Sequence, residues 1–226
     1  MPKITVMGRA VQTIAAERGT VRLTVSFAGA RRDDVVAAAA RTHGTLVGQA
    51  KQHVTSGSAT WWGADQVSAW IYDEWIKPSA QEDETKVRRF RASAGIRVTF
   101  RDFDALSRWV GEVALLDGVA VDGVEWALTE VRRDAAVATV RADAARDAVV
   151  RAQAYAGALG LGPVQLIALY EHGLRPHVGP VSAFGEATAM RAAAGPESYG
   201  GMELRPDDIE VGAEVSADFE ASSGSA

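Results

Sequence analysis

Residues 95–131 read GIRVTFRDFDALSRWVGEVALLDGVAVDGVEWALTEV, and their hydrophobic pattern decides the fold class. Hydrophobic and polar side chains alternate over residues 96–100, which is typical of a strand buried on one face. Asp102 then serves as the N-cap of a helix that ends near Gly118. Residues 119–131 return to a strand pattern. The stretch therefore predicts a sheet that is covered by helices.

The rest of the chain continues this succession of strands and helices. The further strands expected are 4–11, 21–28, 61–77, 164–170 and 209–220, and the further helices are 33–54 and 134–159. The order ββαβ-βαβα-ββ favours an α+β fold with mixed or antiparallel sheets and helices packed on one face. A long loop over 172–208 precedes the last strand, and a connection of that length is typical of a functional, oligomeric or disordered segment.

The domain organisation expected is one α+β domain over 1–220, divisible into sub-lobes 1–86 and 87–220. Residues 221–226 are small and polar and are expected to form a disordered tail. Within the helix predicted over 33–54, Gly44 and Gly48 each lower helix propensity by about 1 kcal/mol relative to alanine. We expect the helix to approach the sheet closely at these two glycines.

Residues 61–77 (WWGADQVSAWIYDEWIK) form the most aromatic of the predicted strands. Alternation places Val67, Ala69, Ile71 and Trp75 on one face, and Trp70, Tyr72 and Ile76 on the other. Apolar bulk on both faces favours a central strand that is covered on both sides. The alternative is an aromatic face that meets another subunit. The candidate interaction surface comprises Trp61, Trp62, Trp70, Tyr72 and Ile76.

Composition excludes several classes of protein. The net charge of −5 argues against a general nucleic-acid binder, and the lack of cysteine excludes disulfides and thiolate sites. No apolar run approaches the roughly 20 residues that span a bilayer. The first residues lack the pattern of a secretory signal. We expect a cytoplasmic protein for the chain as written, or a periplasmic one if the sequence is a trimmed mature form.

The search for catalytic motifs identifies no site. The sequence has no GxGxxG, Walker, GxSxG or HExxH pattern. The basic cluster 88–91 (RRFR) is typical of a solvated strand edge that positive charge protects. His172 and His177 flank Pro176 near Glu171, without the spacing of metal ligands. We therefore expect no catalytic residue, no metal site and no cofactor.

A resemblance to a known family covers nearly the whole chain. The segment IRVTFRDFDAL (96–106) is similar to the strand and following helix of the SIMPL-domain family, as are DGV (122–124) and the alanine-rich helix that ends at Leu159. ITVMGR (4–9) resembles the family's opening I-x-V-x-G strand. ELRPDDIEV (203–211) is similar to its closing P-I-x-P-G-E-L-E-V segment, with Pro206 retained and the glycine replaced.

This resemblance implies an α+β body of undefined biochemical role in a bacterial family that includes periplasmic immunogenic proteins. It also implies homo-oligomers, and some members resemble ring-like or channel-like assemblies. We expect a non-enzymatic, self-associating scaffold or stress-related factor. A protein partner is a further possibility. Two alternatives stay open: a small-molecule binder or enzyme with a pocket near His172 and His177, and an adaptor that uses the Trp-rich strand.

Overall fold

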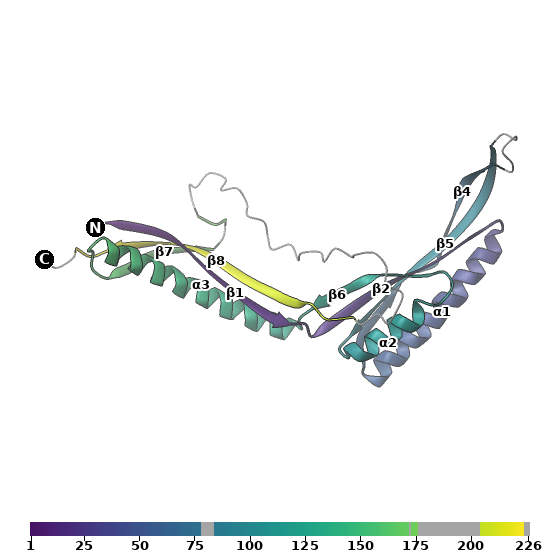
Figure 1. The fold of residues 1–226 in the computed structure, drawn as a ribbon, viewed down its shortest axis with the longest axis horizontal. Coiled ribbons are helices and arrows are strands. Elements are labelled where there is room, and N and C mark those ends of the chain that lie inside the picture. Colours follow the sequence, from purple (N-terminus) through teal and green to yellow (C-terminus); the bar gives the residue numbers. More distant parts are fainter. Residues whose placement is uncertain (78–83, 172, 176–203, 224–226) are drawn as a thin grey trace. The chain divides into compact units, whose positions relative to one another are not determined.

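The computed structural model describes residues 1–77, 84–171, 173–175 and 204–223 (Figure 1). These residues form three helices and eight strands, and every strand pairing is antiparallel. The elements are β1 (Lys3–Ala15), β2 (Arg18–Gly29), α1 (Arg32–Ser56), β3 (Ala59–Ala64), β4 (Ser68–Ile76), β5 (Thr85–Phe100), α2 (Phe103–Val113), β6 (Val119–Ala127), α3 (Glu130–Ala158), β7 (Val164–Glu171) and β8 (Asp208–Ala221). The predicted α+β class is confirmed.

The described residues fall into two compact units. Unit 1 lies within Met1–Ala15, Leu128–Pro196 and Asp208–Ala226, and unit 2 lies within Ala16–Ala127 and Glu197–Asp207. These bounds differ from the sub-lobes 1–86 and 87–220. The reason is that β1 pairs with β8 along its whole length, from Lys3↔Glu220 to Ala15↔Asp208, so the first and last strands share one sheet.

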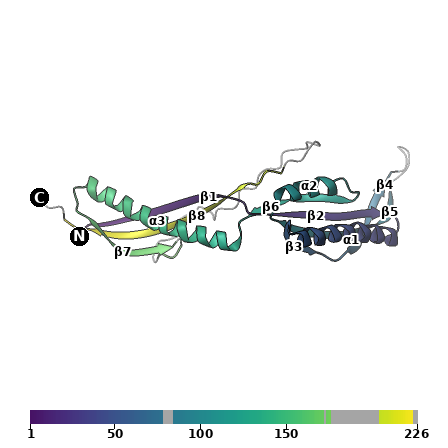
Figure 2. The same cartoon turned by 90° about the horizontal axis from the view of Figure 1, so that it is seen from below.

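Unit 2 is a sheet with helices on one face, as predicted. Its strands run in the order β3-β5-β2-β6, with β4 also paired to β5. Figure 2 shows β2 between α1 and α2, and both helices pack on the same face of the sheet. The fully buried large side chains of this core are Val21, Leu23, Val25, Leu46, Ile96, Val98, Phe100, Leu106, Val110 and Val113. The alternation read at residues 96–100 is therefore confirmed.

Local signals set the helix ends in unit 2. The Asp102 carboxylate accepts a hydrogen bond from the Ala105 backbone N–H at 2.9 Å, so the predicted N-cap of α2 is confirmed. Gly57 ends α1 in the left-handed conformation, at φ 80°. The expected close approach at Gly44 and Gly48 is wrong, because a Cβ on either residue would meet nothing within 4 Å.

Unit 1 is a three-stranded sheet, β1-β8-β7, that α3 covers on one face. The buried stripe of α3 is almost entirely alanine at four-residue spacing: Ala136, Val140, Ala144, Ala148, Ala152 and Ala156. Such small side chains let the helix lie close to the sheet. Gly8 of β1 completes this approach, since a Cβ there would lie 2.7 Å from Ala148 N and closer still to the Ala144 carbonyl oxygen.

Three predicted boundaries are wrong, at the end of β6, the start of α3 and the end of β8. The helix expected over 134–159 begins at Glu130, because Thr129 caps it by accepting from Arg132 N–H at 3.4 Å; the preceding strand ends at Ala127 rather than at residue 131. The tail expected over residues 221–226 does not begin at residue 221. Ala221 is buried in β8 and donates its N–H to the Pro2 carbonyl oxygen at 3.0 Å. Residues 224–226 lie outside the described residues.

Candidate functional site

The Trp-rich segment predicted as one strand over 61–77 is two strands. β3 and β4 pair with successive parts of β5, from Ala64↔Ile96 to Ser68↔Ser93. The join between them contains one residue more than the facing part of β5, and Asp65 N–H donates there to the Gly95 carbonyl oxygen at 2.9 Å. An extra residue of this kind interrupts a strand and shifts its register by one.

This register shift changes which aromatic side chains share a face. Trp61 lies opposite Thr99 and Trp70 lies opposite Arg91, so both project from the face of β5 that the helices do not cover. In an uninterrupted strand, residues nine apart would lie on opposite faces. Within β4 itself the predicted alternation is confirmed, since Ile71 pairs with Phe90 and Tyr72 with Arg89.

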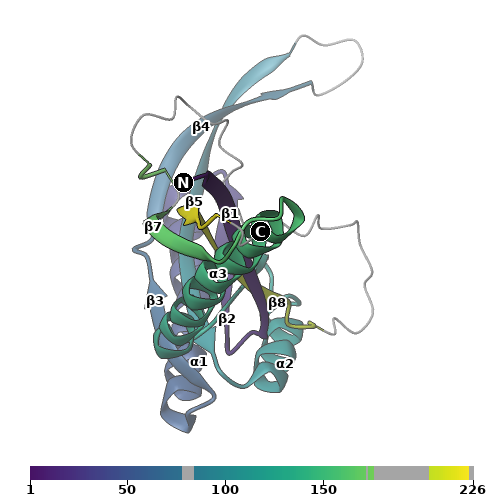
Figure 3. The ribbon, with the colours of Figure 1, turned by 90° about the vertical axis from the view of Figure 1, so that its left-hand side faces the viewer.

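The reading of this segment as a central, doubly covered strand is wrong. Among the described strands, β4 pairs with β5 alone, and β2 accompanies β5 only from Phe90 onward. Residues Trp70–Ile76 and Thr85–Arg91 therefore form a ribbon, here called the β4–β5 arm, most of which has two strands. Figures 1 and 3 show this ribbon clear of α1 and α2.

Large side chains are exposed on both faces of the arm. Trp70 is 45% exposed on one face, while Ile71 at 50% and Trp75 at 63% are exposed on the other. Ile71 and Trp75 were assigned by sequence to an apolar face but not to the interaction surface. Two signals in the sequence indicate that this part of the strand meets solvent. They are the acidic pair Asp73 and Glu74, which follows Tyr72, and the polar run after Pro78.

Both carboxylates of the arm are paired with basic side chains of β5. Arg89 contacts Glu74 at 2.8 Å and Lys86 contacts Asp73 at 2.8 Å, in each case across the two strands. The Arg91 guanidinium lies 5.1 Å from the centroid of the Tyr72 ring. The two carboxylates are therefore satisfied within the arm, which also offers exposed aromatic and aliphatic surface.

The remaining predicted surface residues divide between the two faces. Arg97 lies over the Trp61 ring at 5.8 Å, on the same face as Trp70. Ile76 is half-buried at the far end of β4 on that face. Trp62 does not join them: it packs against the unit 2 core, with Lys51 5.5 Å from its ring. Trp62 is half-buried and lies on the opposite face of the sheet from Trp61 and Trp70.

The alternative pocket near the histidines is only partly within the described residues. His172 and His177 lie outside them. Glu171 ends β7 and contacts Arg141 of α3 at 3.5 Å, which is a surface ion pair. In the described ranges, no three His, Cys, Asp or Glu side chains are grouped closely enough to hold a metal ion.

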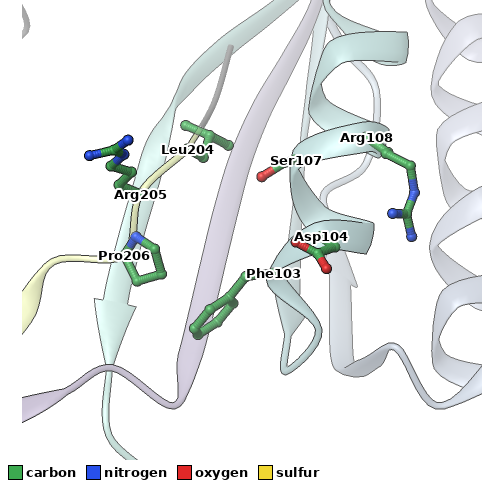
Figure 4. Close-up of a pocket in the computed structure, with 7 residues that line it drawn as sticks. All are labelled: Phe103, Asp104, Ser107, Arg108, Leu204, Arg205 and Pro206. Carbon is green, nitrogen blue, oxygen red and sulfur yellow. The ribbon is translucent and has the colours of Figure 1, made fainter. Parts of the chain in front are cut away.

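One groove in unit 2 has a volume of about 470 Å³ and lies between α2 and the segment Leu204–Pro206 (Figure 4). Its lining is largely apolar, and Phe103 packs edge-on against Trp126 at 5.0 Å. Figure 4 shows the side chains of Arg108 and Arg205 pointing away from each other. Groups that converge on a reacting atom are what a catalytic site requires, and these cations do not converge.

His53 packs inside unit 2 rather than at a site. Its ring lies 5.0 Å from the Phe100 ring and 5.6 Å from the Trp109 ring, and its Nδ1 is 3.0 Å from Ser58 Oγ. Burial lowers the pKa of His53 below 6.5, because the surrounding rings disfavour the charged form. The unfolded chain therefore binds a proton at a pH where the folded chain does not.

This shift predicts a pH dependence of stability. The His53 contribution is fully present above the unfolded pKa of 6.5 and is lost as the pH falls toward the lower folded pKa. Urea unfolding at about pH 7.5 and about pH 5.5 should show a smaller loss of unfolding free energy for His53→Asn than for the wild type. An unchanged loss in His53→Asn would contradict this assignment.

Comparison with known proteins gives a family. A family described as "SIMPL: Protein of unknown function (DUF541)" matches residues 4–219. No curated protein gives a significant match to the chain. None of the helices in the described residues is long and apolar enough to cross a membrane. The match spans nearly all of β1 through β8 and agrees with the strand and helix motifs at 96–106. The chain belongs to the SIMPL family.

Proposed function

We propose that this SIMPL-family chain is a non-enzymatic protein that associates with itself through the β4–β5 arm and so acts as a scaffold. The observation that carries the proposal is the exposure of Trp70, Ile71 and Trp75 on the two faces of a ribbon that none of the described helices covers. Isolated two-stranded ribbons are marginally stable in water, and a further strand or an apolar cover stabilises them. Self-association supplies such a cover.

The chemistry of the arm supports a protein surface as its partner. Aromatic side chains are enriched where proteins bind one another, because they bury much area and lose little conformational freedom. The ion pairs Arg89–Glu74 and Lys86–Asp73 hold both carboxylates of the arm within the ribbon. Beside them the arm exposes Trp70, Ile71 and Trp75, and exposed apolar side chains of this size favour another protein surface as the partner.

The test is the mass of the chain in solution, measured by light scattering after size exclusion. The wild type is expected to run as an oligomer at micromolar concentration. Trp70→Ala should raise the dissociation constant at least about tenfold, since an interface tryptophan commonly contributes more than that factor. Its unfolding free energy should change by no more than about 0.5 kcal/mol, as at other exposed positions.

Leu169→Ala provides the matched control. Leu169 of β7 is 46% exposed, almost the same as Trp70 at 45%, but it lies in unit 1. This variant should keep the wild-type mass at every concentration. A wild-type chain that is monomeric throughout the micromolar range would refute self-association. Dissociation caused by Leu169→Ala and not by Trp70→Ala would place the association surface on β7 instead.

A further inference from the structure

Strand β4 has an edge along which no described strand pairs. Its other edge is fully paired to β5 over nine residues, from Ser68↔Ser93 to Ile76↔Thr85. An unpaired edge carries a row of free N–H and C=O groups, and proteins commonly protect such edges with charge, proline or a covering side chain. In unit 1, Asp147 of α3 gives this protection to β1, accepting the Arg9 backbone N–H at 2.9 Å.

The free edge of β4 carries instead an apolar, aromatic sequence. The residues from Ser68 to Tyr72 include no charge and no proline, and charge enters only at Asp73 and Glu74. Both carboxylates contact basic side chains of β5, on the paired side of the strand. Among the described residues, this edge of β4 is therefore open to a further strand. The side chains of β4 determine which strand could pair with it favourably.

We infer that the strand is β4 of a second copy of this chain, paired antiparallel about a two-fold axis at Ile71. The inference rests on the proposed self-association and names its geometry. In this register Ile71 faces Ile71 of the second copy. Trp70 faces Tyr72 twice, on the face that the helices leave uncovered, and aromatic pairs are favourable cross-strand neighbours. Trp75 lies opposite Val67, the residue just before β4, so apolar side chains also meet at the ends of the paired segment.

The same register places every charge of β4 opposite a neutral residue. Asp73 faces Ala69 and Glu74 faces Ser68, so each carboxylate keeps its own basic partner, Lys86 or Arg89. Like charges that face each other directly across a sheet are destabilising. The pairing thus joins two ribbons into a four-stranded sheet without breaking any ion pair of the arm.

Neighbouring two-fold registers are less favourable. An axis at Asp73 sets two carboxylates face to face. One at Tyr72 sets Glu74 against Trp70 and Asp73 against Ile71, which pairs a charge with two of the three exposed apolar residues. With the axis at Trp70, Tyr72 faces only Ser68, and Trp75 would face Asp65. Only the axis at Ile71 matches apolar with apolar residues and leaves each carboxylate beside a small one.

Disulfide trapping tests the register, because the chain has no cysteine of its own. Ile71→Cys should form a covalent dimer on mild oxidation, since directly opposite residues have Cα atoms about 4.5–5.5 Å apart, within disulfide range. Ser68→Cys and Glu74→Cys keep Ile71 in place. Each alone should cross-link poorly, because identical sites would lie about 20 Å apart along the paired strands. Their mixture should cross-link at least about tenfold faster than either alone.

The outcomes separate this inference from the proposed function. If light scattering gives an oligomer but the mixture of Ser68→Cys and Glu74→Cys links no faster than each variant alone, the register is wrong and self-association stands. Equal trapping at all three sites would also overturn it, because random collision does not select opposite residues. If the chain is monomeric and no pair links, both the register and the proposed function fail.

Discussion

Gly8→Ala is expected to cost unit 1 about 3 kcal/mol of unfolding free energy, the upper part of the range for overpacking a dense core. The added Cβ would lie 2.7 Å from the Ala148 backbone nitrogen and closer still to the Ala144 carbonyl oxygen. Both atoms belong to the backbone of α3, so no rotation of a side chain relieves the clash. The helix has to move away from β1, and its alanine stripe then loses contact with the sheet.

Urea unfolding and hydrogen exchange measure this effect. Amides of α3 should exchange faster in Gly8→Ala, while those of β5 in unit 2 should change little. Gly212→Ala in β8 is the matched control: it is also a strand glycine of unit 1, but a Cβ there meets nothing nearer than 3.6 Å. Its stability should stay within about 1 kcal/mol of the wild type. Equal losses in the two variants would show that strand propensity, and not close approach, governs Gly8.

Phe100→Ala is expected to cost unit 2 about 3–5 kcal/mol, the usual range for removing a buried phenylalanine. Phe100 is fully buried at the end of β5, and its ring lies 5.5 Å from the Trp109 ring. Strand β5 and helix α2 meet at this ring, and neither backbone can close the space that it would leave. The cavity term therefore adds to the lost transfer free energy.

A second measurement makes this prediction specific. The Phe100 ring lies 5.0 Å from the His53 ring, and burial is the main cause of the lowered pKa of His53. Titration followed by NMR should show the His53 pKa moving back toward its ordinary value in Phe100→Ala. Leu115→Ala, at an 83% exposed position, should leave both stability and titration unchanged. A loss below about 1 kcal/mol in Phe100→Ala would show that the site repacks without a cavity.

Local chemistry made several elements predictable. Alternation over 96–100 predicted a strand with one buried face, and the Asp102 side chain caps α2 as its position indicated. The Ala-rich helix and its end near Gly160 follow the same logic, although its start was misplaced because Thr129 is itself a good cap. Signals of this kind act over a few residues, so they survive without knowledge of the fold.

The candidate site was predictable only in part. The aromatic composition of residues 61–77 indicated a candidate interaction surface, and the sequence pattern assigned the two faces of β4 correctly. Its edge position was not predictable, because period-two alternation is the same in a strand covered on both sides and in one covered on neither. The packing of Trp62 against the core and the shared face of Trp61 and Trp70 both depend on the pairing of β3 and β4 with β5.

The glycines also show the difference between what the sequence predicts and what the tertiary structure decides. Gly44 and Gly48 looked like contact points by their place in a helix, yet both face open space, while Gly8 is the residue that a helix touches. Which glycine is required depends on which helix lies on which strand.

By itself, the sequence determined the succession of strands and helices, the α+β class, the family motifs and the aromatic character of residues 61–77. Tertiary structure alone decided that β1 pairs with β8, that β4 lies at an edge and that Trp70, Ile71 and Trp75 are left uncovered. The physical reason is the distance along the chain over which each interaction acts. Propensity and capping are set by neighbours along the chain, whereas strand pairing and exposure are set by contacts between elements, such as that of Lys3 with Glu220, which form only when the chain folds.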